Sequence, residues 1–370
     1  MNIVQVSDSI TVGGAERLLV VFASMARARD ISVTTVSLLD EPGELSYRDE
    51  LISLGSKVVY LPAPRIMDLK RFAELKHFLR CGRFDLAHTH LFYGNIVGTL
   101  AARQVGLPVV STLHSTGRAK TLRAKPREML ETLCLRYLSQ RVIAVGYMVE
   151  EVQHVRFGHK KMDILPNGVP LGVELSNAER TRLRNEMAGG LQGPILFTAG
   201  RFAEPKALHH MVDAFASIQP YFHQVALVMA GDGPLFSQVS AQIKKLNMEK
   251  SIFLLGSRGD VPKLLASADI YVSSSIWEGL PMAILEAMMA GLPVIATGVG
   301  DVPRVVTKGA GLVVPPGQPM ALADAMRRLL AEPETRAQMS QEAKHQALTN
   351  YSADVWMDRL IAIYSEVLGQ

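Results

Sequence analysis

The chain is poor in cysteine and in long apolar runs. Only Cys81 and Cys134 occur among its 370 residues, too few for a disulfide framework or a cysteine-based zinc site. Such scarcity fits a reducing cytosol. No apolar run approaches the roughly 18 residues that span a bilayer, and the opening MNIVQVSDSI has neither the basic region nor the cleavage-like site of a signal peptide. We therefore expect a cytoplasmic protein, with any membrane contact peripheral.

Overall composition is ordinary for a globular protein, with 48% hydrophobic and 20% charged residues, but its charge is uneven. Residues 1–170 hold 22 Lys and Arg against 16 Asp and Glu, whereas the remainder is slightly acidic. The densest basic run comprises Arg118, Lys120, Arg123, Lys125 and Arg127. It is either a solvated surface or a contact for an anionic membrane or a phosphorylated acceptor. Aromatic residues do not interleave with these charges, so nucleic acid is not expected as a partner.

Short β-branched runs alternate with longer segments of helical periodicity, which is typical of βαβ units and parallel sheets. The expected strands of the first half are Ile3 to Val6, Val33 to Leu38, Val58 to Leu61, Leu86 to Thr89, Val109 to Leu113 and Val142 to Val145. Those of the second half are Ile195 to Ala199, Val225 to Ala230, Ile252 to Leu255, Ile270 to Ser273, Val294 to Thr297 and Gly311 to Val314. The pattern predicts an α/β fold of two doubly wound, Rossmann-like domains facing each other across a cleft.

Turn chemistry at Pro166-Asn167-Gly168 separates the two sets of strands. Because 370 residues exceed the usual size of one core, we predict a first domain over residues 1–168 and a second over 169–350. The last segment, 351–370, is amphipathic. It either packs back against the first domain, which we favour, or caps only the second.

Segment 273–297, SSSIWEGLPMAILEAMMAGLPVIAT, is the most informative part of the chain. Glu278 should follow a strand, Pro281 should be the first residue of a helix that stops near Gly291, and Glu286 should lie inside that helix. Free backbone N–H groups at the helix start suit an anion, and carboxylates accept hydrogen bonds from hydroxyls. This combination suits a nucleotide-diphosphate sugar.

A second cationic motif, Gly200-Arg201-Phe202-Ala203-Glu204-Pro205-Lys206, directly follows an expected strand. Ligands of open α/β sheets bind at such strand ends. Arg201 provides a fork of donors and Lys206 a point charge, a pair that suits a diphosphate, although surface charge is the usual role of such residues. Ser257 lies in another strand-end loop and could line a nucleobase.

In the first half, Gly13 and Gly14 precede a helix, where they form either a tight turn or a close approach to a ligand. They do not form Gly-x-Gly-x-x-Gly, so nicotinamide binding is poorly supported. His114 ends a strand and is either a structural group or a hydrogen-bonding partner of a sugar hydroxyl or oxyanion. His88 and His90 alternate on another strand, but no third metal ligand is evident.

These motifs resemble the retaining GT-B glycosyltransferases of family GT4, also called group 1. The resemblance runs nearly end to end, and its most specific element is the pair Glu278 and Glu286 with Gly279-Leu280-Pro281 between them. It implies a first domain that binds the acceptor and a second that binds the nucleotide-sugar donor. One departure is Ala207, where the family usually has glycine; we expect a helix start to tolerate it. Another is Arg304, where glutamate is common.

The resemblance also implies roles for individual residues. Arg201 and Lys206 would bind the donor diphosphate, Glu286 the ribose hydroxyls, and Glu278 with the backbone of Gly279, Leu280 and Pro281 the transferred sugar. His114 would contact that sugar, and the Gly13-Gly14 loop would lie beside the phosphate and the acceptor. We expect UDP as the nucleotide, with GDP second, and a lipid-linked glycan as acceptor, with a small-molecule acceptor as the alternative.

Many sugar transferases hold a divalent ion with an Asp-x-Asp triplet, which this chain lacks. We therefore expect no metal and no cofactor, with Arg201 and Lys206 compensating the diphosphate charge. Two rival hypotheses remain. One is a GT-B-fold nucleotide-sugar epimerase, and the other is a catalytically silent binding or scaffold protein. The intact set of Arg201, Lys206, Glu278 and Glu286 argues against the second.

Overall fold

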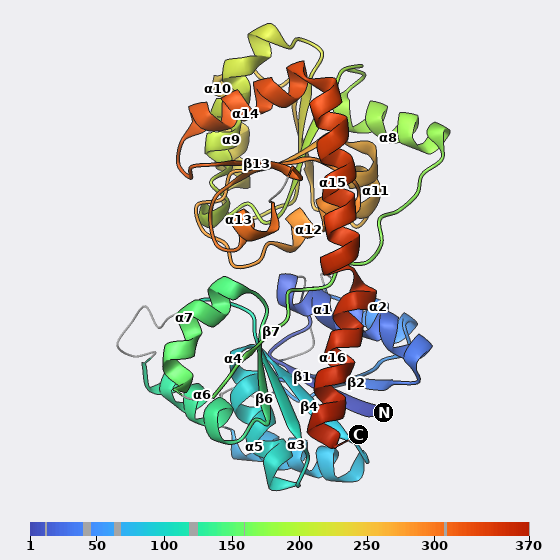
Figure 1. Ribbon diagram of the computed structural model, residues 1–370, viewed down its shortest axis with the longest axis vertical. Coiled ribbons are helices and arrows are strands. Elements are labelled where there is room, and N and C mark those ends of the chain that lie inside the picture. Colours follow the sequence, from blue (N-terminus) through green and yellow to red (C-terminus); the bar gives the residue numbers. More distant parts are fainter. Residues whose placement is uncertain are drawn as a thin grey trace. The chain divides into compact units, whose positions relative to one another are not determined.

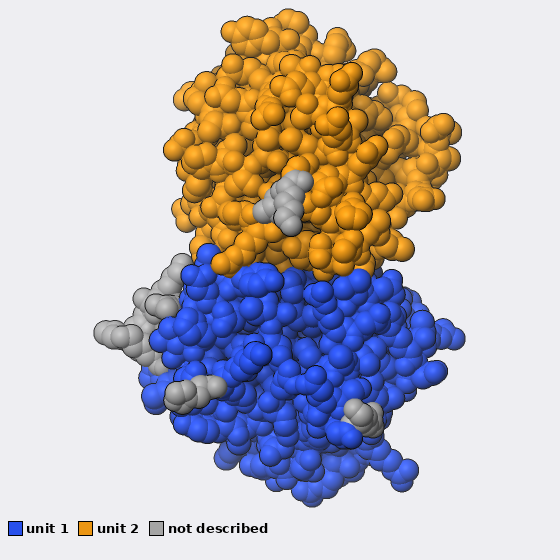
Figure 2. All heavy atoms as spheres, in the orientation of Figure 1, with its two compact units in different colours: residues 1–168, 353–370 blue, residues 169–352 orange. Residues whose placement is uncertain are grey.

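The computed structural model describes residues 1–11, 13–39, 46–62, 68–117, 125–158, 160–306 and 309–369. The chain divides into two compact units (Figure 2). Unit 1 comprises Met1–Gly168 with Ala353–Gln370, and unit 2 comprises Val169–Ser352. Each unit contains one parallel sheet with helices packed around it (Figure 1), which confirms the predicted α/β class with two Rossmann-like sheets.

The sheet of unit 1 has the strand order β3-β2-β1-β4-β5-β6-β7, and all its pairs are parallel. Its strands are β1 Asn2–Ser7, β2 Ser32–Ser37, β3 Lys57–Tyr60, β4 Leu86–His90, β5 Val109–Leu113, β6 Arg141–Ala144 and β7 Asp163–Ile164. The six strands expected from the sequence all form. Only β7 escaped prediction, because two residues are too few for a periodic signal.

Helices connect these strands within the described part of unit 1. They are α1 Gly14–Ala26, α2 Arg48–Ser53, α3 Leu69–Cys81, α4 Leu91–Tyr93, α5 Thr99–Gln104, α6 Lys125–Tyr137 and α7 Tyr147–Phe157, with a 3₁₀ turn at Arg27–Arg29 and a π-helical segment at Gly94–Gly98. As predicted, the first helix begins at the glycine pair, with Gly13 as its N-cap. None of the described helices in either unit is long and apolar enough to cross a membrane.

The last helix, α16 (Ala353–Leu368), belongs to unit 1 and packs against α1 (Figure 1). Phe22 of α1 lies edge-on to Trp356, with 6.4 Å between ring centroids, and 6.2 Å from the ring of Tyr364. At the edge of this contact, the guanidinium of Arg29 forms ion pairs with two aspartates of α16. The aromatic contacts bury one face of α16, which explains its amphipathic pattern.

The sheet of unit 2 has the order β10-β9-β8-β11-β12-β13 and is also parallel. Its strands are β8 Ile195–Ala199, β9 Ala226–Ala230, β10 Ile252–Gly256, β11 Ile270–Ser273, β12 Val294–Thr297 and β13 Gly311–Val314. These match the six expected runs to within one residue at either end. The chain order reverses between β8 and β11, a switch point of the kind at which α/β sheets bind ligands.

The helices of unit 2 are α8 Asn177–Ala188, α9 Leu208–Ile218, α10 Phe236–Lys245, α11 Val261–Ser267, α12 Met282–Met289, α13 Val302–Val305, α14 Pro319–Ala331 and α15 Pro333–Tyr351, with 3₁₀ turns at Glu204–Lys206 and Gln219–Tyr221. One predicted boundary is wrong. Pro281 is the extended N-cap of α12, with ψ of 111°, rather than its first helical residue. The stop is as predicted: Gly291 follows the C-cap with a φ of +78°.

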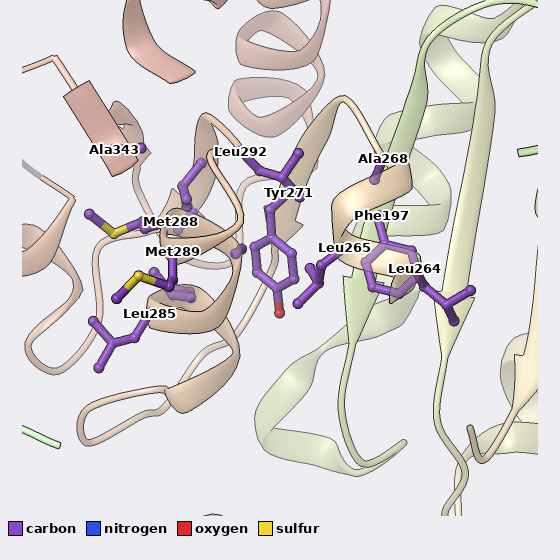
Figure 3. Packing of buried hydrophobic residues seen from close by; sticks show 14 of the residues in the cluster. Phe197, Leu264, Leu265, Ala268, Tyr271, Leu285, Met288, Met289, Leu292 and Ala343 are labelled. Atoms are coloured by element: carbon purple, nitrogen blue, oxygen red, sulfur yellow. The ribbon is translucent and has the colours of Figure 1, made fainter. Parts of the chain in front are cut away.

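One of the hydrophobic cores in unit 2 lies between the sheet and several helices, α12 among them (Figure 3). It joins Phe197 of β8 and Tyr271 of β11 to Leu285 and Met288 of α12, all of which are buried. The hydroxyl of Tyr271 donates to the backbone carbonyl of Ala199, 3.3 Å away at the end of β8. Because these side chains pack α12 against the sheet, they hold Glu286 on a rigid element.

Candidate active site

The structure brings together the predicted site residues of unit 2 that follow β8 and β11. Arg201 and Lys206 come after β8, and Glu278 comes after β11. These two strands are hydrogen-bonded neighbours in the sheet. Because parallel strands end at a common edge, residues 72 positions apart in the chain lie next to each other.

An ion pair between Lys206 and Glu278 forms the centre of this site. The Nζ of Lys206 lies 2.5 Å from the Oε1 of Glu278, which also accepts a hydrogen bond of 2.7 Å from the Oγ of Ser275. The side chains of Lys206 and Glu278 are only 29% and 13% exposed. Water therefore screens this pair less than it would a surface ion pair, and an anion arriving here would compete for the ammonium of Lys206.

Arg201 contributes a second positive charge to the same small pocket, whose lining also includes Gly200, Lys206, Ser275 and Tyr271. Its side chain is exposed, and within the described residues its guanidinium has no ion-pair partner. An exposed fork of N–H donors beside a half-buried ammonium is a suitable arrangement for binding a diphosphate.

The loop that carries Glu278 is held by backbone contacts on both sides. The amide of Ile276 donates to the carbonyl of Pro205 at 2.8 Å, and the amide of Asp301 donates to that of Gly279 at 3.0 Å. Gly300 allows this approach, since a Cβ there would lie 2.5 Å from the carbonyl oxygens of Glu278 and Gly279. Its φ of +57° is a second reason for glycine. The carboxylate therefore sits on a loop with a defined position.

Two backbone features shape the opposite wall. A Cβ on Gly231, after β9, would lie 1.9 Å from the carbonyl oxygen of Gly200, so the two strand-end loops touch through their backbones. Ala207, immediately after the Lys206 turn, adopts the left-handed conformation with φ of +43°. This is the conformation that glycine adopts without cost. It gives a physical reason for the glycine usual at this position in the resembling family, and the chain accommodates alanine there as the N-cap of α9.

Glu286 is the fifth residue of α12 and is half-buried. Burial is the main cause that raises the pKa of the Tyr271 hydroxyl, and the charges of Glu278 and Glu286 raise it further. Both carboxylates therefore act on the same hydroxyl beneath the site.

Three predicted residues have less direct positions. Ser257 follows β10 and is exposed, but β9 separates β10 from β8, and within the described residues no hydrogen bond or ion pair joins Ser257 to the Lys206–Glu278 pair. Leu280 and Pro281 are buried, and Leu280 packs into the core beneath the site. Any contact of these two with a ligand would therefore come from their backbone or from the surface that they support.

In unit 1, Gly13 leaves room for a carboxylate. A Cβ on Gly13 would lie 2.3 Å from Oε2 of Glu16, whose other oxygen accepts from Ser9 at 3.2 Å. Burial raises the pKa of Glu16. The acidic side chain of Glu16 thus folds back over the Gly13-Gly14 turn at the start of α1.

The sequence analysis also missed Asp8, the first residue after β1. Its Oδ1 accepts a 2.7 Å hydrogen bond from the backbone amide of Gly94. Burial raises its pKa to about 7, and the lowering effect of backbone hydrogen bonds only partly offsets burial. Its position at the carboxyl end of β1, beside the point where the chain order reverses between β1 and β4, is the one signal that could have identified it.

His114 lies immediately after β5 and contacts His90, the last residue of β4. The Nδ1 of His90 and Nε2 of His114 are 3.1 Å apart. The neighbouring His88 uses both ring nitrogens, one with the hydroxyl of Tyr364 and the other with Thr112. Burial lowers the pKa of His114 to about 4 and that of His88 to about 3. Burial also lowers the pKa of His90, so the three imidazoles are neutral near pH 7. Among the described residues, no cluster of three or more potential ligands is arranged to hold a metal ion.

Two family models match the chain, one in each half. Residues 12–173 match Glycosyltransferase Family 4, and residues 179–346 match Glycosyl transferases group 1. Among curated proteins, a UDP-Gal:alpha-D-GlcNAc-diphosphoundecaprenol alpha-1,3-galactosyltransferase of Escherichia coli is 30% identical over 63% of this chain, and the match spans 63% of that relative. An N-acetyl-alpha-D-glucosaminyl L-malate synthase of Bacillus anthracis is 26% identical over 81% of this chain and 80% of its own.

Solved structures resemble the whole chain. HepE of Anabaena, crystallised with UDP, is 22% identical and matches with a TM-score of 0.87 over 99% of this chain and all of its own. The same protein crystallised with UDP-glucose matches with a TM-score of 0.85. At this level of identity the likeness establishes the fold alone.

Proposed function

We propose a function from the premise that the chain belongs to the group 1 glycosyltransferases of family GT4 and has their GT-B fold. It transfers a sugar from a nucleotide-diphosphate sugar to an acceptor, with retention of anomeric configuration. The observation that carries this proposal is the convergence of Arg201, Lys206 and Glu278 at one edge of the unit 2 sheet. A diphosphate leaving group develops negative charge as its bond to the sugar breaks. Arg201 and Lys206 compensate that charge, so neither a metal ion nor a cofactor is required.

In this mechanism Glu278 has two tasks. Before the donor binds, Glu278 pairs with Lys206. Once the donor is bound, Glu278 positions the sugar through hydrogen bonds with its hydroxyls, and the diphosphate also interacts with the ammonium of Lys206. The backbone of Gly279, Leu280 and Pro281 borders the sugar. Glu286, held by α12, accepts hydrogen bonds from the ribose hydroxyls. The acceptor attacks from the face that the diphosphate leaves, and the departing diphosphate helps to remove its proton.

We favour a UDP-sugar over a GDP-sugar as donor, and a lipid-linked glycan for surface polysaccharide or glycoconjugate synthesis as acceptor. Support for UDP comes from the UDP and UDP-glucose complexes of the similar Anabaena protein. Support for the acceptor comes from the similar Escherichia coli protein, whose substrate is attached to diphosphoundecaprenol. Unit 1, with its basic character and the Gly13-Gly14 turn, is the proposed acceptor-binding part.

The test is nucleotide release from a panel of UDP-, GDP- and ADP-sugars, with a membrane lipid extract as acceptor, measured in parallel with and without EDTA. We expect release from one donor that persists in EDTA and is stimulated by lipid. Abolition by EDTA and recovery with magnesium or manganese would refute the metal-independent mechanism. Binding of a donor without release, with the recovered sugar inverted at one centre by NMR, would favour the epimerase. Tight binding with an unchanged sugar would favour the scaffold.

Replacement of Glu286 by alanine is expected to lower kcat/KM for the donor by roughly ten- to a hundredfold, because hydrogen bonds to charged groups contribute about 1.5–3 kcal/mol each. The matched control is Glu249→Ala, which removes an exposed glutamate of unit 2. Donor kinetics that respond equally to both substitutions would contradict the ribose-binding role.

We further propose that unit 1 contacts an anionic membrane surface through α6 and the basic segment before it. Residues 118–124 lie outside the described part of the chain, so the support comes from α6. Three large apolar side chains of α6, those of Met129, Leu133 and Tyr137, lie four residues apart and are 63%, 46% and 67% exposed. The guanidinium of Arg136 lies 5.3 Å from the ring centroid of Tyr137. An exposed apolar stripe beside cationic side chains suits the boundary between headgroups and acyl chains.

Reversal of two charges in that segment, Arg123→Glu with Lys125→Glu, is expected to weaken binding to phosphatidylserine-containing vesicles by roughly 30-fold or more, since each basic residue near such a surface contributes about 1 kcal/mol. Leu133→Glu should weaken binding independently of the charge of the basic segment. The controls are Lys250→Glu and Leu348→Glu, which alter exposed residues of unit 2. Vesicle binding that is unchanged by both sets of unit 1 substitutions would count against the membrane contact.

A further inference from the structure

Three consecutive serines lie at the end of β11, just before the loop that carries Glu278. They are Ser273, Ser274 and Ser275, and all three are buried, with exposed fractions of 9%, 2% and 1%. A buried hydroxyl group normally has a hydrogen-bond partner, so each of these serines should make a specific contact. The mechanism proposed above assigns none of them a role.

Ser275 contacts the carboxylate of Glu278 directly. Its Oγ lies 2.7 Å from Oε1 of Glu278, and because an ionised carboxylate only accepts hydrogen bonds, the single proton of this hydroxyl lies on that bond. The Nζ of Lys206 lies 2.5 Å from the same oxygen. Each oxygen of a carboxylate has about two lone-pair sites. Lys206 and Ser275 therefore occupy the capacity of Oε1 between them.

The second oxygen of this carboxylate, Oε2, is in a different situation. Within the described residues, no hydrogen bond or ion pair reaches Oε2 of Glu278. Nor is it one of the fully buried polar atoms that lack a partner in this part of the chain, so Oε2 is accessible to a ligand. The protein thus satisfies one oxygen of Glu278 and leaves the other for a group that donates a hydrogen bond, such as a hydroxyl.

Two further groups hold Ser275 in place. The Oγ of Ser273 lies 3.3 Å from that of Ser275, and since the proton of Ser275 points to Glu278, Ser273 is the donor in this contact. The hydroxyl of Thr297, at the end of the neighbouring strand β12, donates to the backbone carbonyl of Ser275 at 2.5 Å. Both the side chain and the main chain of Ser275 are therefore fixed by paired strands of unit 2.

Ser274 makes a different contact. Its Oγ lies 2.9 Å from the backbone carbonyl oxygen of Lys206 and 3.1 Å from that of Ala207. It therefore supports the turn that carries Lys206, whereas Ser275 supports the carboxylate of Glu278. Neighbouring serines thus hold the two members of the ion pair separately, so one member can change its partner without releasing the other.

We propose that Ser275 is a positioning residue that keeps Oε1 of Glu278 turned toward the protein and Oε2 toward the donor sugar. Its bond is most needed when the diphosphate interacts with the ammonium of Lys206, because it then holds the carboxylate alone. Oε2 accepts a hydrogen bond from a hydroxyl of the transferred sugar, so the site selects a donor with a hydroxyl at that position. The nature of the ligand rests on the proposed function, but the orientation of Glu278 does not.

The orientation can be tested without any ligand. Lys206→Ala removes the ammonium, and in its crystal structure Oε1 of Glu278 should remain within hydrogen-bond distance of Ser275. The addition of Ser275→Val should leave Glu278 in several rotamers, whereas the addition of Ser275→Thr, which has the same shape as valine but keeps the hydroxyl, should retain the orientation. Movement of Glu278 away from an intact Ser275, or an unchanged Glu278 beside valine, would overturn the proposal.

Binding measurements test the effect on the sugar. The probes are UDP, UDP-glucose and UDP-galactose, and the proteins are Ser275→Thr and Ser275→Val, in which any crowding by the added methyl group is common to both. Valine should weaken binding of a UDP-sugar roughly tenfold relative to threonine, with the same Kd for UDP in both. Ser240→Ala, which alters an exposed serine of α10, is the control. Equal weakening of UDP would show that Ser275 acts on the diphosphate, and the proposal would be wrong.

Deoxyfluoro analogues of the same UDP-sugars test the selectivity, because fluorine cannot donate a hydrogen bond. With threonine at position 275, at least one analogue should bind roughly tenfold more weakly than its parent, and this difference should shrink with valine. The same discrimination in both variants would exclude an action through Oε2 of Glu278. The predicted orientation in a protein that binds no nucleotide sugar would leave the contact between Ser275 and Glu278 standing and remove the proposed function.

Discussion

Lys206→Ala is expected to lower kcat by roughly a hundred- to a thousandfold, the usual effect of removing one preorganised donor from a developing negative charge. The ammonium of Lys206 lies at the centre of the strand-edge site, paired with Glu278 and only partly exposed. Its loss removes charge compensation from the leaving diphosphate. It also leaves the carboxylate of Glu278 without its cation, close to the incoming phosphates.

Steady-state and single-turnover kinetics measure this effect, with Lys250→Ala as the matched control because Lys250 is exposed elsewhere on unit 2. Adding Glu278→Gln to Lys206→Ala should recover part of the donor affinity, since it removes the uncompensated anion. Arg201→Ala should also act mainly on kcat, because its charge is most needed as the diphosphate leaves. A change confined to KM in both single variants would show that the cations bind the ground state and the transition state equally.

Asp8→Asn is expected to stabilise the protein at pH 8 by about 3–4 kcal/mol more than it does at pH 4. The reason is the pKa of Asp8, which burial raises from 3.8 to about 7 in the folded protein. Between these two values the folded state keeps a proton that the unfolded state has released, so stability falls as pH rises, by about 1.4 kcal/mol per pH unit. Above pH 7 the wild-type protein has lost all of this stability. The variant does not lose it, because asparagine does not ionise.

Urea unfolding of the wild-type protein and the variant at pH 4, 6 and 8 measures the difference directly. Histidines 88 and 114, whose pKa values burial lowers, titrate in the opposite sense, but their contribution is the same in both proteins and cancels. Asp49→Asn, which changes an exposed carboxylate of the same unit, is the control. A difference between Asp8→Asn and wild type that does not vary with pH would mean that Asp8 is ionised in the folded state.

The strands of both sheets could be predicted because the signal for each is local. A buried parallel strand needs a short run of β-branched and apolar residues, and turn-forming residues must follow it. Residues such as Val294 and Ile295 of β12 show this pattern, and the observed boundaries follow it closely. The two-residue strand β7 has no such run. It forms by pairing with the free edge of β6.

The proximity of the candidate site residues could be expected for a related reason. Arg201, Lys206 and Glu278 each follow a strand, and strands of a parallel sheet end at one edge, so their convergence could be expected before any contact was known. The position of Ser257 was less informative, because strand order determines which loops are neighbours. β10 lies at the outer edge of the sheet, two strands from β8.

By itself, the sequence determined the α/β class, the two sets of strands and the cationic and acidic residues at the strand ends, all of which depend on composition and spacing along the chain; the family followed from the resemblance of its motifs. The tertiary structure decided which groups meet. It paired Lys206 with Glu278, buried Asp8 against the backbone of Gly94, and brought Tyr364 to His88 across 276 residues. These contacts depend on strand order, helix packing and side-chain rotamers, which no local pattern specifies. The charge state of a carboxyl group and the proton position on an imidazole follow from those contacts, so the chemistry of the individual groups emerges only in the folded chain.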